Sequence, residues 1–408
     1  MPPWARMDQP VASSTHPRPT MPPRDDAHTT FVIPCLNEAG TIGGCVSSTL
    51  ALIRRHGMAA RVLVCDNGSD DDSATIARAA GAEVISVPSR GYGSALLAGI
   101  REARSPVVVI GDADGSYDFE DSLPLLEAVE HGADIAMGSR LRGTIEPGAM
   151  PAMHRLVGTP ALTLASRLLF RVPVSDINCG LRAMRRDKVL SLHLASQGME
   201  FASEMLVKAS LRGLRIAEVP IRYARDRRIG RPHLRPWRDG WRHLRLMLLL
   251  CPWLVLALPG LLPFALGATL MLLTLAGPFT LGPVTLDVHT LAVAGMLMIL
   301  GTQALMMAVL ARRHAQQHLL GVPPPRGFMT LERTLGGGAV LMLAGLWSIA
   351  ALFLDWWRMG FGPLDAPQTL RPVIAGATVA IIGAQVVLFA FFRAIIEPRA
   401  ATRDLASP

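Results

Sequence analysis

Four long apolar stretches in the C-terminal half of the chain restrict its fold more than any other feature. They run over about residues 253–275, 289–310, 335–354 and 373–392. Each is close to the ~20 apolar residues that a helix needs to cross a bilayer. No charged residue lies in the middle of any stretch, which is unlike a transporter, where ionisable residues mark the transport path. The sequence therefore predicts an all-α transmembrane domain of about four helices over residues 251–396.

The N-terminal half has the pattern of a separate α/β domain. Short apolar runs alternate with helical patterns, and strands are expected over residues 29–34, 61–65, 82–87, 107–110 and 134–137. Such alternation gives right-handed crossovers and a mostly parallel, Rossmann-like sheet. We expect Pro34 to end the first strand, because proline has no N–H for the sheet ladder.

Acidic clusters follow two of the expected strands. Val107–Ile110 is an unbroken β-branched run that leads through Gly111 to Asp112-Ala113-Asp114, and a second cluster starts at Asp66. Taken alone, the Asp66 cluster is better explained as a helix cap or a solvated turn. Together, at the carboxyl edge of one parallel sheet, the two clusters predict a ligand site. Two carboxylates one residue apart can hold a hard divalent cation, which commonly carries phosphate oxygens.

Both ends of the chain are expected to lie outside the two domains. Residues 1–28 are rich in Pro, Ser, Arg and Asp and lack an apolar core segment, so we predict a disordered tail and no signal peptide. Residues 397–408 are expected to form a cytoplasmic tail. The five cysteines form no CxxC pair, so neither structural zinc nor a disulfide framework is expected.

The distribution of arginine predicts how the chain meets a membrane. Of the net charge of +8, much comes from nine arginines between residues 221 and 245, a stretch that also contains Trp237 and Trp241. Nucleic acid is the competing explanation, but this stretch leads directly into an apolar segment, which favours a basic interfacial segment over residues 231–250. The loop 277–287 has no Lys or Arg, whereas the loop 312–334 has four. This alternation predicts a multi-pass protein of the cell membrane with the N-terminal domain and both termini in the cytoplasm.

Two further segments leave alternatives open. Residues 153–171 mix leucines with His154, Arg155 and Arg167, which fits either an amphipathic helix lying on a bilayer or an ordinary helix packed on the sheet. The glycines at 336–338 and Gly345 would allow close helix packing, as in a homo-oligomer.

Six motifs together resemble a known family. In chain order they are Ile33-Pro34-x-x-Asn37-Glu38, Asp66-x-Gly68-Ser69-x-Asp71, Arg90-Gly91-x-Gly93-x-Ala95, Asp112-Ala113-Asp114, Gly138-Ser139-Arg140 and Asp176-x-x-Cys179-Gly180-Leu181-Arg182. Their order and spacing resemble the family 2 glycosyltransferases of GT-A fold. The last two motifs look like the polyprenyl-phosphate branch, typified by dolichyl-phosphate mannose and glucose synthases. The resemblance implies a GT-A catalytic domain over residues 29–230.

The resemblance also implies roles for individual residues. Pro34 and Glu38 would contact the nucleotide, and Asp66 would recognise its base. Asp112, with Ala113 beside it, would lie near the ribose and the metal, while Asp114 would be a direct ligand of Mg²⁺ or Mn²⁺ that neutralises the leaving diphosphate.

Five more residues are candidates on the side of the acceptor and the phosphates, and the resemblance implies the first two of them. Arg140 would lie near the phosphates. Asp176 matches a position proposed as general base or as positioner of the acceptor, although it could instead only hydrogen-bond its own turn. The arginines that follow the catalytic motifs are candidates to bind the phosphate of a lipid acceptor, namely Arg225, Arg227 and Arg228.

Several positions depart from the family pattern. Leu36 stands where an aromatic residue is common, Asn67 replaces a second aspartate, and Ser116 replaces a glutamine that helps the metal. A Gln-x-x-Arg-Trp motif is absent from the sequence, which favours transfer of a single sugar over processive synthesis.

The leading hypothesis is a membrane-bound, metal-dependent, inverting glycosyltransferase. It would move one hexose from UDP-glucose or GDP-mannose to a polyprenyl phosphate on the cytosolic face. The alternatives are a glycosyltransferase with another membrane lipid or saccharide as acceptor, and a non-catalytic membrane scaffold that keeps the fold.

Overall fold

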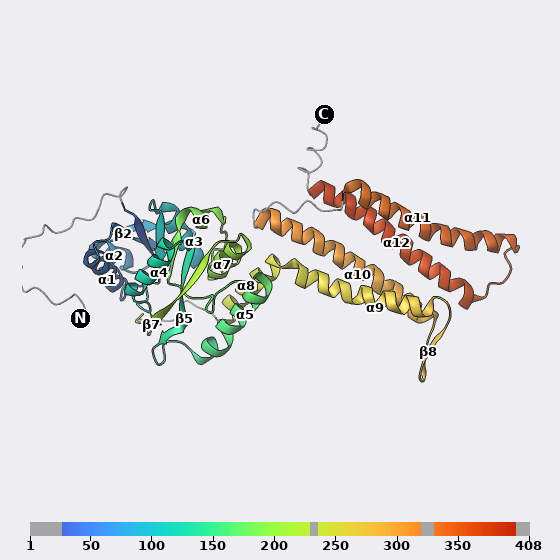
Figure 1. Cartoon of the computed structure of the whole chain (residues 1–408), viewed down its shortest axis with the longest axis horizontal. Coiled ribbons are helices and arrows are strands. Elements are labelled where there is room, and N and C mark those ends of the chain that lie inside the picture. The colour runs from blue at the N-terminus through green and yellow to red at the C-terminus, as the bar shows by residue number, and fades with distance from the viewer. Residues whose placement is uncertain (1–26, 229–235, 320–329, 397–408) are drawn as a thin grey trace, which may run out of the picture. The chain divides into compact units, whose positions relative to one another are not determined.

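The structure is a computed structural model that describes residues 27–228, 236–319 and 330–396. It divides into two compact units, one ending at His243 and the other beginning at Leu244. The first contains the α/β domain, and the second contains the long apolar helices (Figure 1).

The first unit is built on a seven-stranded sheet with the strand order β3-β2-β1-β4-β6-β5-β7. In this sheet β6 runs antiparallel to both of its neighbours, and the other pairings are parallel. The expectation of a mostly parallel α/β domain is therefore confirmed. The strands are β1 (Thr29–Cys35), β2 (Ala60–Asp66), β3 (Glu83–Ser86), β4 (Val107–Ile110), β5 (Ile135–Ile145), β6 (Arg182–Arg185) and β7 (Ile216–Tyr223).

The end of β1 differs from the expectation at Pro34. This strand pairs with β2 in parallel register as far as Cys35↔Asp66, so Pro34 lies inside the strand and the prediction that it ends β1 was wrong. The last residue of β1 that pairs with β4 is Val32, opposite Ile110, so this pairing ends before Pro34. The missing N–H of proline therefore removes little from the ladder, because only one neighbour remains at that point.

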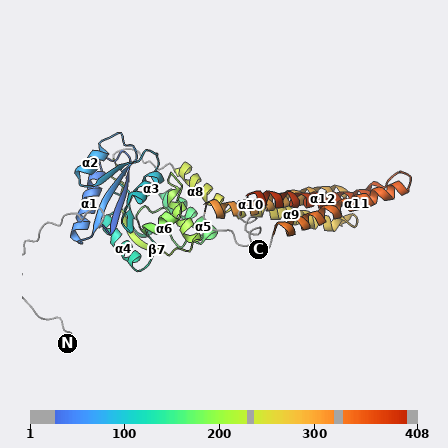
Figure 2. The ribbon, with the colours of Figure 1, turned by 90° about the horizontal axis from the view of Figure 1, so that it is seen from above.

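Helices cover both faces of this sheet (Figures 1 and 2). Burial on both faces explains why β4 is an unbroken apolar run, and its four residues are all buried. The helix α3 comes especially close, since a Cβ on Gly99 would lie 2.3 Å from Cγ1 of Val32. The helices are α1 (Ile42–Arg55), α2 (Ser73–Ala79), α3 (Tyr92–Glu102), α4 (Ser122–Glu130), α5 (Thr159–Phe170), α6 (Arg186–Ser191) and α7 (Phe201–Leu211), with a wide turn, η2 (His154–Gly158), before α5.

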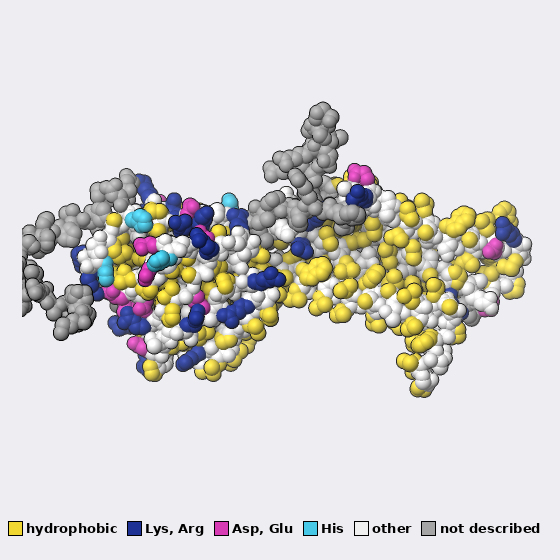
Figure 3. Space-filling view, viewed as in Figure 1, with side chains coloured by type: hydrophobic (Ala, Val, Ile, Leu, Met, Phe, Trp, Pro, Cys, Tyr) yellow, Lys and Arg dark blue, Asp and Glu magenta, His cyan; other side chains and the backbone are white. Residues whose placement is uncertain are grey.

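Among the residues that the structure describes, four helices of the second unit are long and apolar enough to cross a membrane. The spans are Trp253–Thr274, Val288–Gln317, Leu331–Arg358 and Gln368–Ile396, as the four apolar stretches predicted. Hydrophobic side chains dominate their surface, whereas charged side chains gather on the α/β domain (Figure 3). The helices that contain these spans are α9 (Leu258–Thr274), α10 (Val288–His314), α11 (Leu331–Arg358) and α12 (Ala366–Ile396), and α8 (Pro236–Leu250) precedes them.

A small hairpin between α9 and α10 was not expected from the sequence. Its strands are β8 (Phe279–Leu281) and β9 (Val284–Leu286), joined through Gly282 at a φ of +59°. Three residues are too few to establish an alternating pattern, so only the turn glycine signalled the hairpin.

Glycines allow α11 and α12 to pack closely within the chain. A Cβ on Gly345 would lie 2.4 Å from the carbonyl oxygen of Gly376, and one on Gly338 would lie 3.0 Å from the carbonyl oxygen of Gly383. Small residues at such contacts let helix backbones approach in a membrane. The predicted close packing at Gly338 and Gly345 is thus intramolecular, and a homo-oligomer remains a prediction.

Candidate active site

Acidic side chains meet at the carboxyl edge of the sheet. Asp66 is the last residue of β2, and its Oδ1 accepts a hydrogen bond of 3.2 Å from the backbone N–H of Ser69. The next residue, Asn67, is buried; its amide accepts from the N–H of Gly91 at 2.6 Å and donates to the carbonyl of Ser89 at 2.8 Å. An amide can do both, and an aspartate cannot. The departure from the family pattern at Asn67 therefore has a structural reason.

Asp112 follows β4 and is held by its neighbours. The hydroxyl of Tyr92 donates to its Oδ1 at 2.8 Å. Gly180 lies against the other oxygen, since a Cβ there would come within 2.5 Å of Oδ2. Burial, together with the negative charge of Asp114, raises the pKa of Asp112 to about 7.

Asp114 is oriented by the residue two positions later. The backbone N–H and the hydroxyl of Ser116 both donate to its Oδ1, at 2.9 and 2.6 Å. Its Oδ2 lies 3.7 Å from Nη2 of Arg228, and its carbonyl accepts from the N–H of Arg227 at 3.0 Å. Ser116 thus orients the Asp114 carboxylate: Oδ1 accepts both hydrogen bonds from Ser116, and Oδ2 faces the guanidinium of Arg228.

Glu38 completes this group from the loop after β1. Its Oε1 forms an ion pair of 2.6 Å with Nη2 of Arg228, and its Oε2 accepts from the hydroxyl of Thr41 at 3.2 Å. Burial raises the pKa of Glu38, and the charge of Arg228 opposes this shift. One guanidinium therefore lies between the carboxylates of Glu38 and Asp114, in a place where the sequence predicted metal and nucleotide.

The three arginines predicted to hold an acceptor phosphate are not placed together. Arg227 and Arg228 lie at Asp114, as described above. Arg225 instead donates from Nε to the carbonyl of Pro147 at 2.6 Å, and its backbone N–H donates to Glu146. Only two of the three arginines thus lie beside the carboxylates.

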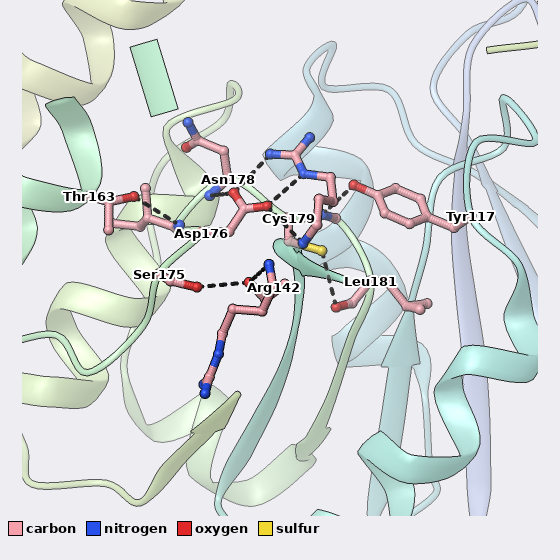
Figure 4. Close-up of polar contacts among 12 residues, drawn as sticks. Tyr117, Arg142, Thr163, Ser175, Asp176, Asn178, Cys179 and Leu181 are labelled. Carbon is pink, nitrogen blue, oxygen red and sulfur yellow. Dashed lines mark hydrogen bonds and ion pairs between the residues drawn. The ribbon is translucent and has the colours of Figure 1, made fainter. Parts of the chain in front are cut away.

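Arg140 and Asp176 form a buried ion pair. Nε and Nη2 of Arg140 donate to Oδ2 and Oδ1 of Asp176, at 2.7 and 2.9 Å, and the backbone N–H of Arg140 donates to Oδ2 at 3.2 Å. The backbone N–H of Asn178 also donates to Oδ1, at 3.3 Å (Figure 4). Arg140 is 8% exposed and Asp176 is 0% exposed. Both carboxylate oxygens are therefore engaged, which favours a positioning role for Asp176 over direct proton transfer.

All three tyrosines of the chain gather at this site. Besides Tyr92 on Asp112, the ring of Tyr223 lies 5.1 Å from Cζ of Arg140 and 5.3 Å from the ring of Tyr117. The hydroxyl of Tyr117 accepts from the N–H of Gly180 at 2.8 Å (Figure 4). Sequence reasoning did not select these tyrosines, although their scarcity, and their restriction to the α/β domain, was a usable signal.

The two remaining nucleotide candidates have mainly backbone roles in the structure. Pro34 lies near the end of β1, and Ala113 is buried between the two aspartates, where its carbonyl accepts from the thiol of Cys45 at 3.4 Å. Their contacts with a nucleotide remain a prediction.

The donor set fits a divalent cation that binds together with its substrate. Among the residues that the structure describes, no cluster of three or more His, Cys, Asp or Glu side chains could hold a metal alone. Asp112 and Asp114 offer two carboxylates, and Mg²⁺ is typically held by one or two carboxylates plus waters and substrate phosphates. Such a donor set suits a metal–diphosphate complex.

A Rossmann-like domain with carboxylates at the sheet edge, linked to membrane-spanning helices, defines a class of membrane-bound transferase. Comparison with known proteins agrees: residues 30–192 match the model of glycosyl transferase family 2, and residues 324–397 match the C-terminal transmembrane region of family 2 glycosyltransferases. The low-salt glycan biosynthesis hexosyltransferase Agl6 of Haloferax volcanii is 35% identical over 365 residues, 88% of this chain and 87% of that protein. The chain belongs to glycosyltransferase family 2, and it is a membrane glycosyltransferase.

Two shorter matches cover the catalytic part. A dolichyl-phosphate hexose transferase of Haloferax volcanii is 34% identical over 204 residues, 50% of this chain and 85% of that protein. A polyprenol monophosphomannose synthase of Mycolicibacterium smegmatis is 33% identical over 225 residues, 51% of this chain and 81% of that protein. The predicted resemblance to the polyprenyl-phosphate branch is thereby confirmed.

Proposed function

We propose that this glycosyltransferase transfers one hexose, from UDP-glucose or GDP-mannose, to a polyprenyl phosphate. The observation that carries the proposal is the gathering of Asp112, Asp114 and Glu38 with Arg228 at one sheet edge, beside the buried pair of Arg140 and Asp176. Carboxylates suit a metal–diphosphate donor, and guanidinium groups suit phosphate oxygens. The names of the two shorter relatives support hexose donors and lipid-phosphate acceptors.

On the donor side, Asp112 and Asp114 would hold Mg²⁺ or Mn²⁺ together with the diphosphate. The cation would neutralise negative charge on the leaving nucleoside diphosphate. Tyr92 and Ser116 keep the two carboxylates in place through the hydrogen bonds given above. Pro34, Glu38, Asp66 and Ala113 would surround the nucleotide, as the family resemblance implies.

On the acceptor side, Arg227 and Arg228 would bind the lipid phosphate, with Arg140 close to the phosphates. Asp176 would act by orienting Arg140. A phosphate monoester is anionic near neutral pH, so its oxygen can attack the anomeric carbon without a protein base. The bond from that carbon to the diphosphate oxygen breaks as the new bond forms, and the anomeric configuration inverts.

We also propose that the catalytic domain faces the cytosol, at the cell membrane. Support comes from the arginine-rich stretch before the first span and from the loop 277–287, which lacks Lys and Arg. The domain division, with GT-A residues 29–230, the interfacial segment 231–250 and the tails outside residues 29–396, belongs to the same proposal.

The test is a donor screen on membranes that contain the protein, read by mass spectrometry of the lipid fraction. Asp114→Ala should abolish transfer, while Asp72→Ala, an exposed aspartate before α2 with no side-chain cap hydrogen bond, should leave it unchanged. Undiminished transfer by the Asp114 variant would refute the metal assignment.

Two further measurements separate the alternatives. A sugar product that resists mild acid would indicate another membrane lipid as acceptor, because polyprenyl-phosphate sugars are acid-labile. Calorimetric titration with UDP and with GDP, each with Mn²⁺, tests the alternative of a non-catalytic membrane scaffold, because a scaffold would bind neither nucleotide.

A further inference from the structure

Large hydrophobic side chains are exposed over one continuous segment of the catalytic domain. They belong to η2, to the residue before it and to α5, and their exposed fractions are 63% for Met153, 72% for Leu156, 55% for Val157, 57% for Leu164 and 74% for Leu168. We call these five side chains the α5 apolar face. Single exposed leucines are ordinary, but a contiguous group marks an interaction surface.

The polarity of α5 is reversed relative to a helix packed on a soluble core. Its buried residues are Thr159, Thr163, Ser166 and Phe170, so three hydroxyl groups face the domain, while Leu164 and Leu168 face outward and Leu162 and Leu169 are half-buried. A helix that packs on a sheet normally buries its leucines. Of the two explanations of residues 153–171 that the sequence left open, this arrangement favours the amphipathic helix, since Leu164 and Leu168 lie outside the packed face.

The charged side chains of this segment are of one sign. Arg155, Arg167 and Arg171 are exposed, and residues 147–175 contain no Asp or Glu. An apolar stripe with arginines and without acidic groups fits the interface of a bilayer that contains anionic lipids. In Figure 3, hydrophobic and basic side chains lie together at the edge of the domain where Figure 1 places α5.

We propose that the α5 apolar face inserts into the surface of an anionic bilayer. The family and the four spans already make this a membrane protein, so a bilayer is available to the domain. The leucines would lie among the acyl chains near the headgroups, and the arginines would contact lipid phosphates. Insertion of this face is thus a second attachment of the chain to the membrane, besides its spans.

The same helix is bonded to the segment that carries Asp176. The hydroxyl of Thr163 accepts from the backbone N–H of Ile177 at 3.4 Å (Figure 4), and Nε of Arg167 donates to the carbonyl of Val174 at 2.7 Å. Asp176 in turn holds Arg140. Insertion of α5 would therefore set the depth of Arg140 relative to the lipid phosphates, and this part of the inference rests on the proposed function.

The direct test is quenching of a fluorophore by brominated lipids in the full-length protein. Four of the five native cysteines are buried, so a Cys251→Ser background leaves an introduced cysteine as the reactive thiol. Leu168→Cys is labelled and compared with Thr75→Cys, an exposed position on α2, a helix that lies away from α5 in both ribbon views (Figures 1 and 2).

We expect the label at position 168 to be quenched in proteoliposomes with brominated acyl chains, and the label at position 75 to remain bright. Equal brightness at the two positions would overturn the proposal. A label at 168 that is shielded from water but not quenched would also overturn it, because a second copy or another protein would then cover the face. This test uses no substrate, so its result does not depend on the proposed function.

The functional consequence is tested with Leu164→Glu/Leu168→Glu, with Thr75→Glu as control. The double variant should raise the KM for the lipid acceptor by roughly tenfold or more, as expected when burial of two leucines is lost, with an unchanged Kd for the nucleotide. Leu164→Met/Leu168→Met should behave like the parent protein. An unchanged acceptor KM in the glutamate variant would refute the coupling between α5 and the acceptor site.

Discussion

Replacing Asp176 by asparagine tests whether this residue positions Arg140 or acts on the substrate. The carboxylate of Asp176 is fully buried, and both of its oxygens accept from the guanidinium of Arg140. Asparagine leaves a buried positive charge with a single neutral oxygen. Removing one partner of a buried ion pair costs about 3–5 kcal/mol. For a domain of this size, that loss lowers the melting temperature by roughly 6–20 °C.

Thermal unfolding can be followed with a thiol-reactive fluorogenic dye in detergent. Cys35, Cys45, Cys65 and Cys179 are buried in the catalytic domain, so they react only when this domain opens. Cys251, the half-buried fifth cysteine, lies in the membrane unit, so it is replaced by serine in every variant. In this Cys251→Ser background the cysteine-specific signal reports on the catalytic domain separately from the membrane helices.

The matched control removes both charges together. Arg140→Gln/Asp176→Asn should be more stable than Asp176→Asn alone, by about 1–3 kcal/mol, because contacting residues couple in this range. If Asp176 acts only by holding Arg140, the double variant should transfer sugar no more slowly than Arg140→Gln. A parent-like melting temperature for Asp176→Asn, with loss of kcat well beyond that of Arg140→Gln, would refute the positioning role and favour a general base.

Three further predictions concern other parts of the molecule. Arg228→Gln should tighten Mn²⁺ binding about fivefold in calorimetry. The cation then no longer has to displace the guanidinium of Arg228 from Asp114, an ion pair that contributes on the order of 1 kcal/mol. Weaker Mn²⁺ binding would contradict this prediction. Burial lowers the pKa of His243 from 6.5 to about 4, so the unfolded chain binds a proton at a higher pH than the folded chain. The free energy of unfolding should therefore fall by about 3 kcal/mol as the pH falls from 6.5 to 4. In His243→Gln the melting temperature should depend less on pH over this range, and an unchanged slope would contradict the prediction. Gly345→Val should lower the melting temperature of the membrane unit, since overpacking costs about 1–3 kcal/mol, while Gly336→Val, where a Cβ meets nothing within 4 Å, should not; equal effects would refute the close contact of α11 and α12.

Much of the architecture was predictable because it follows from local patterns. Four apolar stretches of membrane-spanning length identify four helices, whatever they pack against. The β-branched run of β4 predicted a strand buried on both faces. Pro34 shows the limit of local rules. Whether a proline ends a strand depends on which neighbouring strands are still paired at its position, and the sequence around it does not show this.

The site was predictable only in part. The motif aspartates were selected because they follow strands, and Asp112 and Asp114 do lie at the sheet edge. The sequence did not predict that Ser116 would orient Asp114 or that Arg228 would lie between Glu38 and Asp114. These contacts join loops that are distant in sequence, so no local spacing encodes them.

By itself, then, the sequence determined the class of the protein: an α/β domain with a carboxylate site, followed by membrane helices. Periodicity, length and motif order are local properties, and they suffice for that. Only the tertiary structure decided that the Asp176 carboxylate binds Arg140, and that α5 turns its hydroxyls inward and Leu164 and Leu168 outward. Both results depend on which surface each side chain meets after folding, and an amphipathic pattern alone does not say which face is packed.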